Sequence, residues 1–390
     1  MVTPSAHSFA PRALRLRLTG ALSLRDGQMQ QRSVAIEDGR ISKGPLPEVD
    51  LTGYYILPGI VDLHGASLDF RRAALPAVRD PTSLLAASEA EAAAHGVTTA
   101  WLGQGWSWEG GHADPAEAQR MLALQAAYAD GRARLDLRAS LICETHTVES
   151  RDALLAAVRR FRVDLVLFSN RLAALQARRT LGGPGQADLA QRMRRAAQDS
   201  HDVPRHLCRL AEGFDTLGAS YGSLDDPDGE TRETFSMIGA KLCVRPARRT
   251  AAALARAVGD PVLLPAPAVL DVGSNRNDCP AIDFVRDGLC NALVSNLSYP
   301  AMARAAFTLA DKDILPLADA WNLVSAAPAA IMGLPDRGVI DYGRRADLAI
   351  VNAGTRAVEG TIVAGRIAHL AGMAAERFLT GRAGVAVAAE

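Results

Sequence analysis

The chain has 390 residues, which is long enough for one large domain or two of ordinary size. Its 43 basic and 43 acidic residues cancel, so no global field attracts the protein to nucleic acid or to an anionic membrane. A hydrophobic content of 48% and a charged content of 22% are typical of a soluble globular protein.

The five cysteines are scattered, odd in number and without a Cys-x-x-Cys pair, which argues against a disulfide framework and a structural zinc site. They are Cys143, Cys208, Cys243, Cys279 and Cys290. The sequence shows no signal peptide and no long uncharged apolar run, so we expect a cytoplasmic protein.

The N-terminal part of the chain predicts short strands. Residues 1–12 have no periodicity and are expected to form a loose leader. Alternation over 14–18, a second apolar run at 33–36 and a turn at 37–40 follow. This pattern predicts a β-rich N-terminal module.

The segment 57–64 has the sequence Leu-Pro-Gly-Ile-Val-Asp-Leu-His. Ile60 to Leu63 predict a short buried strand that follows a Pro-Gly turn and ends on His64. In α/β barrels, polar residues at the carboxyl ends of such strands carry the chemistry. His64 is therefore the first candidate site residue.

Helices and strands then alternate along the chain. The predicted helices are 84–95, 117–130, 151–161, 186–199 and 204–217. The predicted strands are 97–102, 135–143, 163–168, 219–221, 240–244, 262–264 and 292–295. This order favours a parallel α/β barrel or a doubly wound sheet. The first strand is not followed by a phosphate-binding glycine fingerprint, which argues against a dinucleotide fold.

The C-terminal part returns to strand patterns at 338–352 and 358–367. From residue 371 the chain is alanine-rich and predicts a short helix followed by a disordered end.

Several motifs resemble the amidohydrolase superfamily. Residues 57–64 are similar to its first barrel strand, Pro-Gly-apolar-apolar-Asp-apolar-His-x-His, and residues 343–351 to its Gly-x-x-Ala-Asp-Leu segment. Residues 63–69, 295–307 and 334–350 are similar to segments of the phosphonate-metabolism branch. Hydrolases of that branch release diphosphate from a ribose methylphosphonate triphosphate.

The resemblance implies a two-part fold. We expect a TIM-like parallel (β/α) barrel over 57–335 and a small composite β-sandwich from 14–56 and 336–370, with 371–390 as a tail. By the same resemblance, a homo-oligomer is expected.

The resemblance also implies a chemistry that uses two divalent metals, zinc or manganese, bridged by a carboxylate. The metals activate a water, and a carboxylate on the last strand handles the proton. His64 and Glu144 remain at such ligand positions in this chain. Ala66 replaces the second ligand of the first strand, and Asn296, which cannot act as a base, replaces the catalytic Asp.

Other ligand positions of the family are also substituted. Arg171 and Leu224 each replace a histidine ligand, and so does Asn275. We expect the residues at these positions to converge in one pocket at the end of the barrel, namely His64, Glu144, Arg171, Leu224, Asn275 and Asn296.

Two interpretations of the remaining ligands stay open. His64 and Glu144 could hold a remnant metal, with His146 as a third ligand, although a loop histidine is expected to be solvent-exposed. We prefer the interpretation in which His64 is a hydrogen-bonded barrel residue and Glu144 pairs with Arg171. No cofactor is then expected.

Three functions follow as hypotheses. The first is a metal-dependent hydrolase with altered ligands. The second is a barrel with little or no metal-dependent activity that binds a small phosphorylated or phosphonate ligand or a partner. The third is a metal-free enzyme that uses Asp225, Asp226 or Asp69 for acid–base chemistry. Neither nucleic acid nor a membrane is an expected partner.

Overall fold

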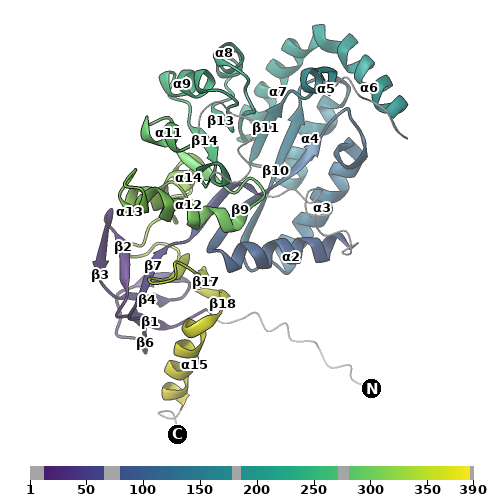
Figure 1. Ribbon diagram of the computed structural model, residues 1–390. Coiled ribbons are helices and arrows are strands. Elements are labelled where there is room, and N and C mark those ends of the chain that lie inside the picture. Colours follow the sequence, from purple (N-terminus) through teal and green to yellow (C-terminus); the bar gives the residue numbers. More distant parts are fainter. Residues whose placement is uncertain (1–12, 66–79, 178–185, 271–280, 387–390) are drawn as a thin grey trace, which may run out of the picture.

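The computed structural model describes residues 13–65, 80–177, 186–270 and 281–386. A nearly closed parallel barrel of eight strands forms the larger part, and two smaller sheets pack beside it (Figure 1). The fold class predicted from the sequence, a TIM-like barrel with a small sandwich from both chain ends, is confirmed. Within the described residues, no helix is long and apolar enough to cross a membrane.

The barrel strands follow one another in sequence order, and each is parallel to the next. They are β8 (Ile60–Gly65), β9 (Val97–Trp106), β10 (Asp136–Glu144), β11 (Leu165–Ser169), β12 (Ser220–Leu224), β13 (Leu242–Val244), β14 (Val262–Pro265) and β15 (Ala292–Val294). The last strand meets the first where the Asn296 N–H donates to the His64 carbonyl over 3.2 Å.

Side chains of the strands alternate between the barrel interior and the surrounding helices. Val61 and Leu63 pack in one buried cluster with Leu165 and Leu167 from β11. Ile60 instead packs in the cluster that includes the apolar faces of the covering helices. The short apolar runs recognised in the sequence therefore bury both of their faces, as parallel strands in barrels do.

The helices cover the outside of the barrel, and most lie between consecutive strands (Figure 1). They are α2 (Pro81–Ala94), α3 (Pro115–Gly131), α4 (Arg151–Phe161), α5 (Leu172–Ala177), α6 (Gln186–Gln198), α7 (Val203–Leu217), α8 (Gly229–Met237), α9 (Arg249–Ala257), α10 (Ala266–Val269), α11 (Ala281–Arg286), α12 (Tyr299–Asp311), α13 (Leu317–Asn322) and α14 (Ala326–Ile331). Helix α2 begins three residues earlier than expected, because the Asp80 carboxylate accepts the Ser83 N–H over 2.9 Å and caps the helix.

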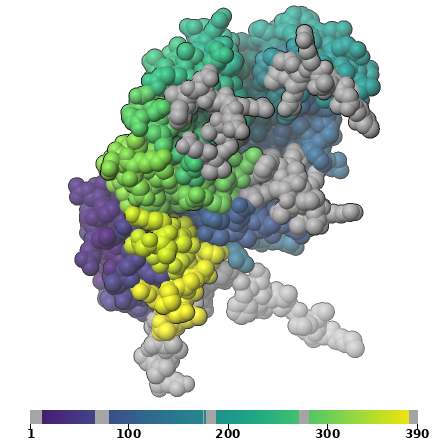
Figure 2. Space-filling view, viewed as in Figure 1, coloured from purple at the N-terminus to yellow at the C-terminus, as the bar shows by residue number. Residues whose placement is uncertain are grey.

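Two sheets form the smaller part of the molecule. One has the order β5 (Arg40–Ser42), β4 (Val34–Glu37), β1 (Leu16–Thr19), β6 (Glu48–Asp50). The other has the order β18 (Arg366–Leu370), β17 (Val358–Val363), β16 (Leu348–Asn352), β7 (Tyr54–Pro58), β2 (Leu22–Arg25), β3 (Gln28–Gln31). Strand β16 pairs antiparallel with β7, so one sheet contains both ends of the chain. In Figure 2 the purple N-terminal and yellow C-terminal surfaces adjoin accordingly.

The C-terminal helix α15 (Gly372–Ala386) is longer than the short helix expected from the sequence. Its Ala374 and Phe378 belong to the buried cluster between the two sheets, together with Leu18 and Ile350. Phe378 is only 2% exposed. The helix is therefore packed onto the sandwich core.

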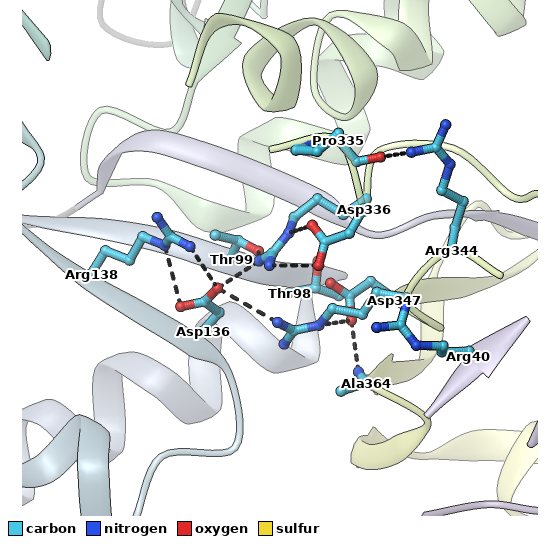
Figure 3. A network of polar contacts seen from close by, with 12 residues as sticks. Arg40, Thr98, Thr99, Asp136, Arg138, Pro335, Asp336, Arg344, Asp347 and Ala364 are labelled. Atoms are coloured by element: carbon cyan, nitrogen blue, oxygen red, sulfur yellow. Dashed lines mark hydrogen bonds and ion pairs between the residues drawn. The ribbon is translucent and has the colours of Figure 1, made fainter. Parts of the chain in front are cut away.

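A network of ion pairs joins the sandwich segments to the amino ends of the barrel strands (Figure 3). The Arg337 guanidinium donates to Asp136 Oδ2 over 2.6 Å and to Thr99 Oγ1 over 2.9 Å. Arg345 pairs with Asp347 over 2.9 Å and approaches the same Asp136 oxygen at 3.6 Å. Asp136 begins β10, so this junction lies at the end of the barrel opposite His64. The junction holds the two parts together away from the candidate site.

Candidate functional site

A cavity of about 620 Å³ lies at the barrel mouth, which is the ring formed by the carboxyl ends of the barrel strands. Its lining includes His64, Ser169, Asn170, Arg171, Leu224, Asp225, Phe235, Arg245 and Leu297. Three of the residues expected to converge, His64, Arg171 and Leu224, thus share one cavity. Ala66 and Asn275 lie outside the described residues.

His64 is positioned by the strand that carries it and by Asp62. The buried Asp62 carboxylate accepts the His64 N–H over 3.2 Å and the Ser295 N–H over 2.9 Å, which ties β8 to the end of β15. The imidazole is 5% exposed, and its Nδ1 has no hydrogen-bond partner within the described residues. Burial, together with the nearby Arg245 cation, lowers the pKa of His64 to about 3. The ring is therefore neutral at pH 7.

Glu144 ends β10 and is 2% exposed. Its carboxylate accepts the His146 N–H over 2.8 Å and the Arg171 N–H over 3.2 Å. The expected ion pair between Glu144 and Arg171 is wrong: the Arg171 guanidinium pairs with Glu109 at 3.2 Å, and only its backbone contacts Glu144. Glu109 lies on the loop after β9. This loop passes close to Arg171, so the long arginine side chain forms its ion pair with Glu109.

His146 is also placed differently from the expectation. Its side chain is 9% exposed, not solvent-exposed, and its Nδ1 lies 3.3 Å from Glu144 Oε1. The Glu144 carboxylate draws the loop inward by accepting the backbone N–H of the same residue. The imidazole is thereby held against the carboxylate.

Asn296 takes part in a cluster that the sequence did not predict. Its Oδ1 accepts a hydrogen bond from Arg245 Nη1. The same guanidinium binds both oxygens of Asp225, at 2.9 Å from Nε and 2.6 Å from Nη2. All three residues have positive φ angles, 42° for Asn296, 53° for Arg245 and 62° for Asp225. Such conformations are uncommon for residues other than glycine and gather at functional sites.

Comparisons with known proteins agree with this architecture. No family model matches the chain. The chain is 25% identical over 366 residues to the alpha-D-ribose 1-methylphosphonate 5-triphosphate diphosphatase of Escherichia coli (strain K12). The matched region covers 84% of this chain and 92% of that protein. The predicted resemblance to the phosphonate-metabolism hydrolases is confirmed by this relative.

Solved structures show the same amidohydrolase-type fold. The β-aspartyl dipeptidase from Fervidobacterium islandicum AW-1 has a TM-score of 0.65 at 14% identity, over 92% of this chain and 97% of that chain. A solved amidohydrolase has a TM-score of 0.62 at 14% identity, over 92% of this chain and 100% of that chain.

The amidohydrolase resemblance implies a divalent-metal centre, and within the described part of the barrel mouth the donors are too few for one. Among the described residues, no three His, Cys, Asp or Glu side chains are grouped so that they could hold a metal ion. The Glu144 carboxylate accepts two backbone N–H groups, and the positive charge of Arg245 lies close enough to His64 to lower its pKa. A cation bound to His64 would be repelled by this guanidinium.

The acidic residues of the metal-free hypothesis have structural partners. Asp225 pairs with the Arg245 guanidinium. Asp226 is 1% exposed and accepts the Ser223 hydroxyl over 2.5 Å and the buried Arg232 guanidinium over 3.4 Å. Asp69 lies outside the described residues.

Arg245 is the site residue that sequence reasoning missed. It directly follows β13, just as Asn296 follows β15 after one residue, and its N–H continues the strand pairing to Leu263 at 2.8 Å. The rule that found His64, a polar residue at the carboxyl end of a barrel strand, would have found Arg245 as well.

Proposed function

We propose that this protein is an amidohydrolase-type barrel that binds a small phosphorylated or phosphonate ligand and has little or no metal-dependent hydrolytic activity. The observation that carries the proposal is the composition of the barrel mouth. An arginine pair, Arg171 and Arg245, lines the cavity together with the neutral His64, and Asn296 stands at the family's catalytic Asp position. Each guanidinium pairs with one carboxylate, Glu109 or Asp225, and an arginine has further N–H donors that favour an oxyanion over a divalent cation.

The sequence relationship supplies the ligand class for this proposal. The similar Escherichia coli protein is named for a ribose phosphonate triphosphate. A cavity of about 620 Å³ is within the range of small-molecule sites, so it can accept a ligand that carries one or more phosphoryl groups.

Elemental analysis and an activity assay test the proposal together. The purified protein should contain less than one equivalent of zinc, manganese or iron. It should release no diphosphate from nucleoside or ribose triphosphates, with or without added metal. Its thermal unfolding midpoint should rise when a phosphorylated or phosphonate compound binds the folded state.

A second candidate is a working metal-dependent hydrolase with altered ligands. It is favoured by one observation, the buried Nδ1 of His64, which has no hydrogen-bond partner within the described residues. A stoichiometric metal, together with turnover that a chelator abolishes, would establish this candidate and overturn our proposal.

A further inference from the structure

We infer that Arg245 binds a tetrahedral PO₃ group, a phosphate or a phosphonate, at the barrel mouth, where the amidohydrolase resemblance would place a metal centre. This inference rests on the proposed function and names the residue and the ligand chemistry that the proposed function leaves open. It assigns to Arg245 the contact that the family would make through a metal ion.

The Arg245 guanidinium has more hydrogen-bond donors than its contacts within the described residues use. A guanidinium group has five N–H donors. Asp225 accepts from Nε and Nη2, and Asn296 accepts from Nη1, so these contacts use three of the five. The remaining two belong to Nη1 and Nη2. The terminal edge of a guanidinium fits two oxygens of one phosphoryl group.

The Arg245 guanidinium lies at the barrel mouth, where a ligand can reach it. The Arg245 side chain is 27% exposed and lines the cavity at the barrel mouth, as His64 does. Arg245 donates to Asn296, whose N–H donates to the His64 carbonyl over 3.2 Å, so the guanidinium lies next to the segment that carries the one histidine retained from the family pattern. The cation therefore lies where the resemblance places metal chemistry.

Protein contacts fix the Arg245 guanidinium before any ligand arrives. Asp225 follows β12, Arg245 follows β13 and Asn296 lies just beyond β15, so three barrel strands hold one planar group. A side chain held in this way loses little conformational entropy when it binds, which favours affinity. Asp225 offsets part of the charge of the guanidinium, and the neutral amide of Asn296 orients the group without adding a second negative charge.

The two arginines of the cavity differ in their exposure and in their contacts. Arg171 has a 59% exposed side chain and one contact with Glu109, so it lies at the rim. Arg245 is less exposed and has contacts on both sides of its guanidinium. A ligand would meet Arg171 on entry and Arg245 at the inner end of the cavity.

Titration calorimetry with an excess of chelator tests the assignment. The probes are inorganic phosphate and methylphosphonate, with acetate as a planar carboxylate for comparison. Wild-type protein should bind both phosphorus oxyanions without metal and should bind acetate more weakly. Arg245→Met should weaken binding at least tenfold. Arg248→Met is the matched control, because Arg248 is exposed and does not line the cavity, and it should leave binding unchanged.

Two further measurements separate ligand contact from a structural role. Methylguanidinium should restore phosphate binding to Arg245→Ala, which a merely structural defect would not allow. In wild-type protein, phosphate should protect Arg245, and not Arg248, from modification by phenylglyoxal, as mapped by peptide mass spectrometry. The second measurement needs no variant and remains decisive if the substitutions prevent folding.

The outcomes distinguish this inference from the proposed function. Binding that is equal in wild type and in folded Arg245→Met, or equal phenylglyoxal modification with and without phosphate, would overturn the role of Arg245 alone. Tighter binding of acetate than of phosphate would overturn the ligand class. No binding of any oxyanion, or binding that requires zinc or manganese, would overturn the proposed function as well.

Discussion

Asn296 is the residue whose substitution gives the most direct test of the barrel-mouth chemistry. Its Oδ1 accepts from the Arg245 guanidinium. We expect Asn296→Asp to release no diphosphate from triphosphate substrates, even with added zinc or manganese. The new carboxylate would form an ion pair with Arg245, and the His64 and Glu144 side chains would still be too few to hold a metal.

The same substitution should weaken phosphate binding several-fold, because the added negative charge opposes the oxyanion. Diphosphate release and calorimetry measure the two effects. Asn296→Ala, which removes the amide without adding charge, is the control. Metal-dependent turnover in Asn296→Asp would show that one substitution separates this chain from an active enzyme.

His206 gives a pH-dependent prediction. It lies on α7, is 3% exposed, and neither ring nitrogen has a hydrogen-bond partner within the described residues. Burial, reinforced by the Arg151 cation, lowers the pKa of His206 to about 4. The pKa of a histidine in the unfolded chain is near 6.5. Between pH 6.5 and pH 4, His206 is therefore protonated in the unfolded chain and neutral in the folded one, so the free energy of unfolding falls as the pH falls.

We expect His206→Leu to reduce this loss by up to about 1.4 kcal/mol per pH unit between pH 6.5 and 4. Urea unfolding at a series of pH values measures it. The matched control is His201→Leu, because the His201 side chain is 76% exposed. Identical pH dependence in wild type and His206→Leu would contradict the prediction.

The candidate site was predictable from the sequence only in part. His64 and Asn296 were found because motifs and strand ends mark them, and the structure brings them to one barrel mouth. The partners of Arg171 and Arg245 were not predictable in this way. A long arginine side chain can reach several acceptors, and only the folded structure determines which of them lies nearby. Arg171 pairs with Glu109 and Arg245 with Asp225, and the sequence alone does not indicate either ion pair.

At the scale of elements, helix α15 offers a comparison between adjacent residues. Phe378 is 2% exposed and packs in the sandwich core, whereas Leu379 is 69% exposed. We expect Phe378→Ala to lower the free energy of unfolding by about 3 kcal/mol, through lost burial and the cavity that remains. Leu379→Ala should change it by less than about 0.5 kcal/mol. Equal effects in urea unfolding would show that α15 does not pack as described.

The elements show why periodicity succeeds in some segments and fails in others. The barrel strands were recognisable because apolar runs such as Ile60 to Leu63 stand between turns and helices. Strand β3, with the sequence Gln-Met-Gln-Gln at the edge of its sheet, buries too little to show any pattern. Helix α15 has a weak apolar stripe, so only the packed structure reveals its length.

At the scale of the whole molecule, hydrogen bonds and ion pairs between protein groups connect the strands and segments at both ends of the barrel. At the amino end, Arg337 joins the sandwich segments to Asp136 at the start of β10. At the carboxyl end, Asp62 and the His64 carbonyl accept N–H groups from the segment after β15, and Arg245 bridges Asp225 and Asn296. Metal ions need not hold the barrel together when these contacts are present.

Removal of metal should therefore leave the stability of the whole molecule unchanged. A ligand stabilises a fold only by binding the folded state, by RT ln(1 + [L]/Kd), so a protein that binds no metal loses nothing to a chelator. We expect the thermal unfolding midpoint to shift by less than about 1 °C on dialysis against a chelator, and by no more when zinc or manganese is added at micromolar concentration. Phosphate serves as the positive control, because it should raise the midpoint in the same instrument and buffer. A chelator that lowers the midpoint by several degrees, reversed by one equivalent of zinc, would mean that the folded protein holds a metal.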